Sequence, residues 1–511
     1  MKKFVLPMTA IAAFALSASS FAATNSTESL EAQVQALSAQ TKQLQHEVWL
    51  LSHPKKTKIK KSHALHKTPE TQTVETTQTA HATHIRENPE IVSLWHHYVS
   101  VTATPYLSRH SSYAGSDLLY NVSSMNEDLL LLQQKQALVN QLAKAGLAIH
   151  HPMIQLSGAV EGELYSSKAF TSNSANGGAT SGVTLSTGEL DVNAIASSWA
   201  SAFMALDFNG SPVSTGNRAP NSTIYLERGF LTIGNLNKAP VYFTIGEMYS
   251  PFGVYKNSMV TTPETQSMME IRSPTAVLGF SKNNFLASIY TYQGSETSGG
   301  NTIFKQGGVN AAYTKTFGSG NSINFGGGWV TNIADSQGMQ GTGYNTASGQ
   351  FGGFGSADNA NSNPNNLAHS VGGADANAAF VLGRFTLLGE YLTATEHFAP
   401  SDLQYNNVGA LPSAEHAEVD YLLPFFAKKY GTALGVSYDH TAQALALNLE
   451  QNKYAVFLNT SIWRETIESI EYNYQTDYGT GDTSTGGGAT TPIVGTGKGI
   501  NSVLAEVGVY F

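Results

Sequence analysis

The residues in this chain that could do chemistry are mostly carboxylates, and they recur at every second position of otherwise apolar segments. Near residues 466–478, Glu471 and Asp477 share one parity, while Ile470, Tyr472 and Tyr474 share the other. Successive side chains of a β-strand point to opposite faces. The segment therefore predicts a strand with an acidic, water-facing side and an apolar side.

The same parity rule places twelve carboxylates on polar strand faces, and we predict that they line the lumen of a pore. They are Glu161, Glu163, Glu189, Asp191, Asp207, Glu390, Glu418, Asp420, Asp439, Glu471, Asp477 and Glu506. From Met153 onward the chain carries 15 Lys and Arg against 27 Asp and Glu, a net charge of −12, whereas residues 1–152 carry 13 against 10. Walls of one charge sign concentrate counter-ions, so we expect this lumen to favour cations or neutral solutes.

Pairing with cations from the loops is the alternative interpretation of these carboxylates. The basic residues that could provide such partners are Arg218, Lys256, Arg272 and Lys305. Arg228 directly follows Glu227, so parity leaves the face of that pair open. An anion-selective phosphate pore, which needs a ladder of Lys or Arg, is disfavoured in either case.

The sequence lacks recognisable motifs for catalysis and for metal binding, so we predict a protein that is not an enzyme and needs no cofactor. The sequence contains no HExxH motif, no P-loop and no Ser/His/Asp set with supporting context. Eleven of the fifteen histidines fall between His46 and His151, at spacings that match no defined metal site. Of the four later ones, His416 alone falls on a predicted lumen face.

The elements that must position these carboxylates are strands. Period-two patterns between turn-rich segments predict sixteen of them. Their ranges are 153–166, 182–196, 199–210, 222–236, 240–248, 270–282, 285–295, 307–317, 321–334, 369–383, 385–396, 414–427, 431–441, 452–462, 466–478 and 500–511. Long and short connections alternate along this series, as in outer-membrane barrels with short periplasmic turns and both termini in the periplasm.

The fold prediction is therefore an all-β, transmembrane antiparallel barrel over 153–511, with an N-terminal α-helical and coiled-coil extension in the periplasm. No stretch reaches the 18 or so apolar residues of a spanning helix. A closed barrel is the other structure that satisfies every backbone group in lipid. The composition agrees, with 13% charged residues, 48 Gly and no Cys.

Residues 1–22 are predicted to be a signal peptide. Lys2 and Lys3 precede an apolar run from Phe4 to Leu16, and small residues stand before a cleavage site after Ala22. At the other end, Phe511 closes a strand whose alternate residues are apolar, and this resembles the C-terminal signal that the barrel-assembly machinery reads. Both ends of the chain predict export to the bacterial outer membrane.

Residues 26–53 are predicted to form a coiled coil, because apolar residues step by four and three without a slip. Its core positions are Leu30, Val34, Leu37, Thr41, Leu44, Val48 and Leu51. The favoured consequence is a homo-oligomer of undetermined number, and the alternative is a single amphipathic helix packed against another element.

Between the coiled coil and the barrel we predict a disordered, basic and His-rich linker over 54–100 and a helical segment over 101–152. Within the latter, a helix over 126–145 carries Leu129, Leu132, Leu138 and Leu142 and ends at Gly146. It either plugs or braces the barrel mouth, or it merely leads into the first strand.

The order of these segments resembles a known family. The segments Gly115–Asn121 and Ser124–Leu129, the entry strand Leu156–Gly162 and a sixteen-stranded barrel are similar to the siderophore porins of Legionella and Coxiella relatives. That family, typified by the legiobactin receptor, was once classed as of unknown function. The resemblance implies uptake of ferric siderophore without a TonB-linked plug, since TonB-dependent receptors have about twenty-two strands and a plugged lumen.

Three functional hypotheses follow. The first is a siderophore porin whose partners are outer-membrane lipid, the barrel-assembly machinery and a ferric siderophore or other small solute, with no nucleic acid. The second is a general or cation-selective diffusion porin. The third is a structural or adhesive surface barrel that binds through its Gly/Ser/Asn-rich loops. An acidic lumen would repel an anionic ferric complex, so basic loop residues would have to make the first contact, or the chain carries another solute.

Overall fold

The computed structural model describes residues 91–94, 97–103, 125–144, 152–168, 179–210, 222–294, 306–318, 321–341, 367–423, 431–463, 466–486 and 492–511. All of them belong to one compact unit, Thr77–Phe511. The predicted signal peptide (1–22), the predicted coiled coil (26–53) and the predicted linker up to residue 90 lie outside the described residues.

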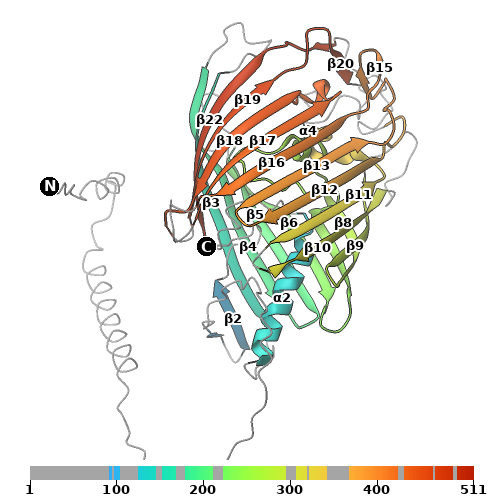
Figure 1. The fold of residues 1–511 in the computed structure, drawn as a ribbon. Helices are drawn as coiled ribbons and strands as arrows, with labels where there is room; N and C mark the ends of the chain where they lie inside the picture. Colours follow the sequence, from blue (N-terminus) through green and yellow to red (C-terminus); the bar gives the residue numbers. More distant parts are fainter. Residues whose placement is uncertain are drawn as a thin grey trace, which may run out of the picture. The chain divides into compact units, whose positions relative to one another are not determined.

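Sixteen antiparallel strands form a closed barrel, which confirms the predicted number and order (Figure 1). The ring closes where the last strand, β22, pairs with the first, β3, from Ala159–Tyr510 to Lys168–Asn501. The strands are β3 (Met153–Lys168), β4 (Ala179–Ile195), β5 (Ala200–Gly210), β6 (Ser222–Gly234), β7 (Val241–Tyr249), β8 (Arg272–Lys282), β9 (Phe285–Tyr292), β10 (Gln306–Thr316), β11 (Ser322–Val330), β12 (Gly373–Leu382), β13 (Phe385–Ala394), β16 (Ser413–Leu422), β17 (Thr432–Ala442), β18 (Asn452–Thr460), β19 (Thr466–Thr476) and β22 (Gly499–Tyr510).

The two ends of the barrel differ in their connections. At one end, here called the turn end, the connections are as short as residues 283–284 and 383–384, and β3 begins and β22 ends there. At the other, the loop end, the connections include 250–271, 331–372 and 477–498. The alternation predicted from the sequence is therefore present. The main difference is that β16 ends at Leu422, five residues before its predicted end.

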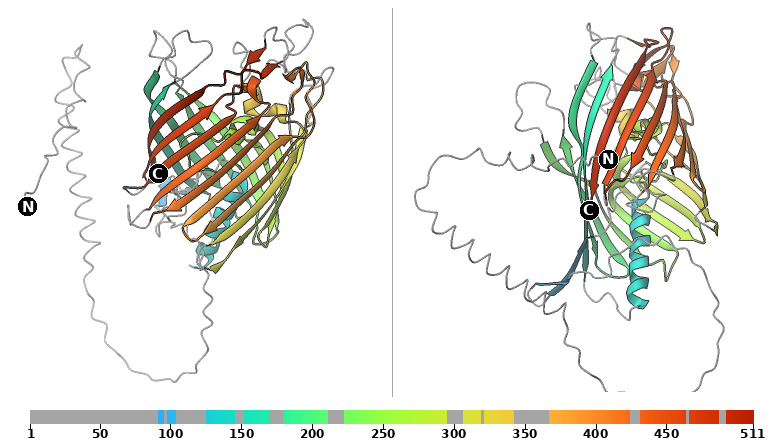
Figure 2. Two further views of the ribbon diagram at one scale, coloured as in Figure 1. Left: turned by 45° about the horizontal axis from the view of Figure 1, so that its top comes forward. Right: turned by 60° about the vertical axis from the view of Figure 1, so that its left-hand side comes forward.

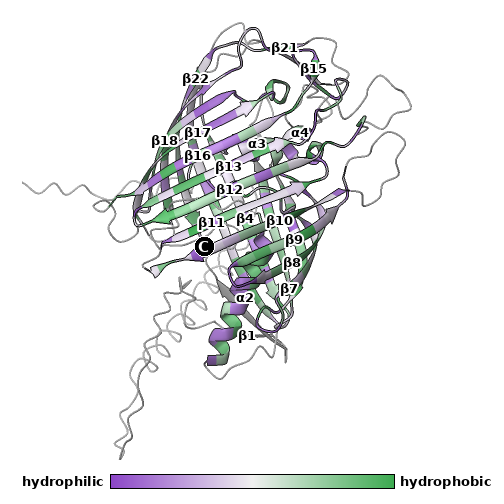
Figure 3. Ribbon diagram, turned by 45° about the vertical axis from the view of Figure 1, so that its right-hand side comes forward, coloured by the Kyte–Doolittle hydropathy of each residue, from purple (hydrophilic) through white to green (hydrophobic). Residues whose placement is uncertain are grey.

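Hydrophobic and hydrophilic residues alternate along the strands of the barrel (Figure 3), and many of the hydrophobic ones are exposed on its outer face. Large apolar side chains on alternate positions of the strands are exposed there, including Leu190, Leu231, Ile245, Val436 and Ile470. Their neighbours in sequence point inward and are buried. This alternation lets one ribbon meet hydrocarbon on one face and polar groups on the other.

Two strands precede the barrel. β1 (Ile91–Leu94) and β2 (His97–Ala103) form a hairpin, and β2 pairs in parallel with the first residues of β3, from Ser100–Met153 to Ala103–Leu156. These residues fall in the predicted linker and in the predicted helical segment, so the hairpin corrects both predictions. The two residues between the strands, Trp95 and His96, carry no turn signal, which explains why the hairpin was not expected. β2 occupies the edge of β3 that β22 leaves free where it ends at Phe511.

Helix α2 (Glu127–Lys144) coincides with the helix predicted over 126–145 and lies at the turn end (Figure 2). Its apolar face carries Leu129, Leu131, Leu132 and Leu138, all buried. They pack in clusters with inward-facing side chains of the barrel: Phe203, Phe230, Tyr242 and Ile195. Because these partners alternate with exposed residues on their strands, α2 enters the lumen from the turn end. Among the described helices, none has the length and apolar character needed to cross a membrane.

The connections at the loop end carry structure of their own. Segments from two of them form a small sheet of β14 (Leu403–Tyr405), β15 (Val408–Gly409), β20 (Thr483–Gly486) and β21 (Ile493–Val494). Short helices stand in three others: α3 (Glu264–Met269), η2 (Ile333–Asp335) with α4 (Gln337–Gly341), and η4 (Leu445–Leu447). One apolar cluster joins these segments through residues such as Phe252, Met268, Met339, Phe398 and Leu447. The loop end is therefore packed as a unit.

Candidate functional site

The inward loop, residues 250–271 between β7 and β8, crosses the interior of the barrel. It hydrogen-bonds to β13, β16, β17, β18 and β19, none of which is a sheet neighbour of β7 or β8. Only a segment running through the lumen can reach that wall. The loop turns sharply at its start, where Gly253 has φ +78 and a Cβ would clash with the Tyr255 ring.

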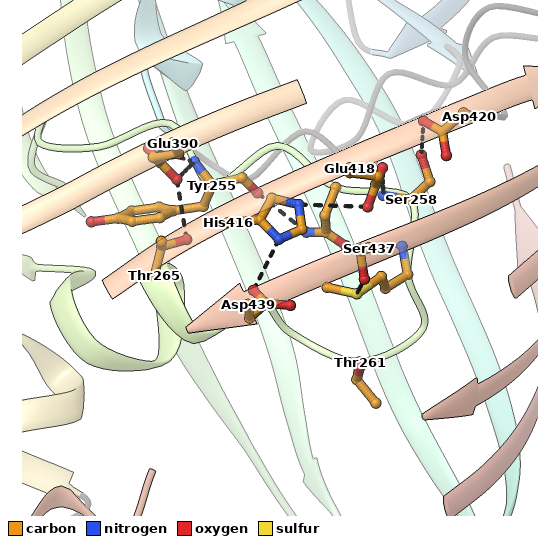
Figure 4. Close-up of polar contacts among 12 residues, drawn as sticks. Tyr255, Ser258, Thr261, Thr265, Glu390, His416, Glu418, Asp420, Ser437 and Asp439 are labelled. Atoms are coloured by element: carbon orange, nitrogen blue, oxygen red, sulfur yellow. Dashed lines mark hydrogen bonds and ion pairs between the residues drawn. The ribbon is translucent and has the colours of Figure 1, made fainter. Parts of the chain in front are cut away.

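Glu390 on β13 binds both limbs of this loop (Figure 4). On the outgoing limb, its carboxylate accepts hydrogen bonds from the backbone N–H of Val254 at 2.6 Å and of Tyr255 at 3.0 Å. On the returning limb, it accepts one from the hydroxyl of Thr265 at 3.2 Å. One inward-facing carboxylate thus fixes the base of the loop.

The middle of the loop is held by β16. The Ser258 N–H donates to Glu418 Oε1 at 2.8 Å, and the Ser258 hydroxyl donates to Asp420 Oδ2 at 3.2 Å (Figure 4). Asn459 on β18 donates to the Ser258 carbonyl at 2.7 Å. Met259 packs against the inner side chain of Phe457.

The tip of the loop is held by Glu471 on β19. Its carboxylate accepts from the N–H of Val260 at 2.6 Å, from the N–H of Thr261 at 2.9 Å and from the Thr261 hydroxyl at 2.6 Å. The chain then turns back, and Asp439 on β17 accepts from the Glu264 N–H at 3.1 Å. Loop N–H groups have no helix or sheet partner, so carboxylates on the wall satisfy them.

Two buried basic side chains lie among these carboxylates. His416 on β16 stands between Asp439 (Nδ1 to Oδ1, 2.9 Å) and Glu418 (Nε2 to Oε2, 3.6 Å), as Figure 4 shows. Lys453 on β18 donates to the Thr262 carbonyl at 2.7 Å and lies 3.7 Å from Glu264. The buried wall is therefore a mixed network of acids and bases, and not a surface of bare negative charge.

A second ionic cluster fixes the start of α2 inside the lumen. The buried Arg228 guanidinium on β6 pairs with Glu127 of α2 at 3.1 Å, with Glu189 of β4 and with Glu227 at 3.3 Å. Further along α2, the Lys135 ammonium donates to the Trp199 carbonyl at 3.3 Å. Burial lowers the pKa of Lys135 to about 8. The contacts of α2 thus combine apolar packing with a few buried charges.

A β-bulge explains why parity did not settle the face of Arg228. The register between β5 and β6 shifts between Ala205 and Leu206, so that Glu227 is an extra residue on β6. A bulge of this kind reverses parity along a strand. Arg228 faces the interior, and no period-two rule could have located it. Lys453 was missed for another reason, since its partners lie on the inward loop.

The twelve predicted carboxylates divide by exposure. Eight are buried: Glu161, Glu189, Asp191, Glu390, Glu418, Asp420, Asp439 and Glu471. Four are half-buried: Glu163, Asp207, Asp477 and Glu506. Five of the buried group share the network under the inward loop, whereas Glu189 pairs with Arg228 and Asp191 accepts from the Ser157 hydroxyl at 2.9 Å. That the twelve line a permeation path stays a prediction.

The ion pairs shown for these carboxylates run to Arg228 and His416. Of the loop cations considered from the sequence, Lys256 interacts electrostatically with Glu390. Arg272 lies 3.8 Å from Glu247, which is not one of the twelve. Arg218 and Lys305 are outside the described residues. Within the described part of the chain, no group of three or more His, Asp or Glu side chains could hold a metal ion.

Comparisons with known proteins give sequence relatives. A UPF0422 protein of Legionella pneumophila strain Lens is 37% identical over 421 residues, which cover 80% of this chain and 76% of the relative. A UPF0422 protein of Coxiella burnetii is 32% identical over 424 residues, covering 81% and 85%. No family model matches the chain.

Solved structures with a similar course of the chain are porins. The anion-selective porin from Comamonas acidovorans has a TM-score of 0.45 at 11% identity, covering 71% of this chain and 100% of its own. OprB of Pseudomonas putida has a TM-score of 0.42 at 11% identity, covering 73% and 96%. The strand pairing described above defines the fold independently of these matches.

Proposed function

We propose, from the premise that this chain belongs to the UPF0422 family, that it is an outer-membrane porin for ferric siderophore without a TonB-linked plug. Transport, and not catalysis, is the proposed activity.

The closed ring of strands and its apolar exterior support a position in the outer membrane. Every strand of the barrel has two hydrogen-bonded neighbours, so no strand edge faces lipid over the paired residues. This is the arrangement that hydrocarbon requires of strands. The turn end, with β3 beginning and β22 ending there, is assigned to the periplasm, and the loop end to the outside.

The observation that carries the proposal of a selective passage is that segments of the chain fill the lumen from both ends. The inward loop covers the wall of β13–β19, and α2 covers the wall of β4–β7 at the turn end. Both are fixed by buried contacts. Such a lumen suits a selected solute better than free diffusion, and the packed loop end provides a recognition surface.

A ferric siderophore is proposed as the solute because of the resemblance to siderophore porins and the charge of the interior. Eight of the twelve carboxylates are buried, most of them in hydrogen bonds or ion pairs, so they present little charge to a solute. Glu163, Asp207 and Glu506 are the half-buried acids along β3, β5 and β22. This distribution removes much of the expected repulsion of an anionic ferric complex, while it favours small cations for the ionic current.

Planar-bilayer conductance tests the proposal. Purified full-length protein should form steady channels, and a ferric polycarboxylate siderophore at micromolar concentration should block the current, whereas the iron-free siderophore should block at least tenfold less well. Unblocked current with both compounds would contradict the siderophore assignment and leave a diffusion porin. No channels at all would contradict the porin.

A cation-selective diffusion porin is the second candidate, favoured by the three half-buried acids. In a tenfold salt gradient, the reversal potential should indicate cation preference, and a triple variant Glu163→Gln, Asp207→Asn, Glu506→Gln should move it towards zero. Glu415→Gln is the matched control, because Glu415 is exposed on β16 at outward parity. Anion preference in the unmodified protein would contradict the charge assignment.

A further inference from the structure

A polar pocket of about 540 Å³ lies at the turn end, between α2 and two turns of the barrel. It is lined by Gln133 and Gln136 of α2, by residues 236–240 between β6 and β7, and by residues 281–283 between β8 and β9. Its volume is in the range of sites for small molecules and short peptides. Neither the inward loop nor the Arg228 cluster contributes to it.

The walls of this pocket are fixed by their own hydrogen bonds. The Gln136 side chain donates to Asn237 at 2.7 Å, and the Asn237 side chain donates to Asn140 at 2.9 Å, which ties α2 to the turn. The Lys238 N–H donates to the Asn235 carbonyl at 2.8 Å. Beneath the turn, Leu236 packs with Leu129 and Leu132 of α2. The lining groups are therefore held in place before any ligand arrives.

The charge of the pocket is opposite to that of the barrel. Lys238 and Lys282 are exposed at its rim, and the lining residues include no Asp or Glu. The remaining polar groups are the side-chain amides of Gln133, Gln136, Asn237 and Asn283. In a barrel segment of net charge −12, this pocket is a place where a carboxylate meets ammonium groups and no acid among the lining residues.

We infer that this pocket binds a carboxylate-bearing peptide. Ammonium groups recognise the carboxylates, and side-chain amides both donate and accept hydrogen bonds, as the amide groups of a peptide do. A phosphate headgroup only accepts, so it would leave the amide oxygens of the pocket without donors. With the turn end in the periplasm, which rests on the proposed function, the stem peptides of the cell wall have this chemistry.

The test uses the full-length protein in detergent and a free-acid stem tetrapeptide, with binding measured by isothermal titration calorimetry. We expect saturable binding that weakens about tenfold in the double variant Lys238→Ala, Lys282→Ala, and that weakens further as salt rises. The conservative variant Lys238→Arg, Lys282→Arg should bind within about twofold of the unmodified protein. Lys498→Ala is the matched control, since Lys498 is exposed in the connection between β19 and β22.

Two comparison ligands decide the chemistry. The same tetrapeptide with amidated carboxyl groups should lose binding, and soluble dihexanoyl-phosphatidic acid at pH 8, which has no headgroup hydroxyls, should bind more weakly than the free acid. Equal binding of the amidated peptide, equal binding by the double variant, or preference for the lipid would overturn the inference. Channel conductance measured on the same preparations separates the two proposals: intact ferric-complex block without peptide binding defeats this inference alone, whereas the absence of channels defeats the proposed function.

Discussion

The inward loop and α2 both enter the lumen, yet the walls that receive them have different chemistry. The wall under the loop is rich in carboxylates, among them Glu390, Glu418 and Glu471. The wall under α2 is largely aromatic and aliphatic, with Phe203 and Phe230. The difference follows from the backbone hydrogen bonding of the segment that each wall receives, which is the inward loop or α2. A helix satisfies most of its own N–H groups, whereas an extended loop does not and needs acceptors from outside.

Arg228→Met should have the largest effect on this comparison. It removes the cation shared by Glu127 and Glu189 and leaves their charges buried, which should lower the free energy of unfolding by about 3–5 kcal/mol. Urea unfolding in detergent measures it, and limited proteolysis should show faster cleavage within α2 with no change in the inward loop. Arg384→Met, on an exposed turn residue, is the control and should stay within about 0.5 kcal/mol. A loss below 1 kcal/mol at Arg228 would show that α2 depends on apolar packing alone.

Glu471→Leu should have a smaller effect, confined to the loop. The substitution leaves the N–H groups of Val260 and Thr261 without their acceptor, so the free energy of unfolding should fall by about 2 kcal/mol. Released from its tip, the loop should also make single-channel current noisier. An exposed outward residue of the same strand, Tyr472→Leu, is the matched control. If Glu471→Leu matched the control in free energy of unfolding and in current noise, the inward loop would not need carboxylate acceptors on the wall.

The smallest expected effect is an opposite pH response of the two segments. Burial raises the pKa of Glu270 in the inward loop to about 8. Between pH 4.5 and 8 the folded state therefore holds a proton that the unfolded state has lost, so the loop loses stability as the pH rises. For Lys135, with a pKa lowered to about 8, the unfolded state holds the extra proton between pH 8 and 10.5, so α2 gains stability as the pH rises.

Spin labels can measure these responses, because the chain has no native cysteine and accepts introduced ones at chosen sites. A label on the inward loop should become more mobile from pH 5 to 8, and a label on α2 should become less mobile from pH 8 to 10. Glu270→Gln and Lys135→Met should each flatten the response of their own segment. Parallel responses of the two labels would contradict the assignment of these groups.

Local periodicity predicted the barrel well, because each strand has one face in an apolar environment and the side-chain period is two. It also predicted α2, whose leucines repeat at helical spacing. It could not predict the partners of the inward-facing acids. Glu390 meets Val254 across more than a hundred residues of chain, and nothing local to either residue encodes that meeting. Parity identified an inward face but could not say what covers it.

The remaining errors have equally specific causes. The bulge opposite Ala205 reversed the parity that would have placed Arg228. The β1–β2 hairpin gains its pairing from the free edge of β3, a feature of the finished ring and not of the hairpin sequence. Each missed feature depends on a neighbour supplied by another part of the fold.

The position of α2 also constrains the order of the assembly steps of the barrel. The helix stands before β3 in the chain, but its buried first half lies within a ring that is complete only when β22, the last strand made, has joined β3. Either the ring is drawn shut around a helix already in place, or the helix is threaded through the turn end of a finished ring. The two orders leave different intermediates, and a disulfide trap between α2 and β6, introduced during assembly, would distinguish them.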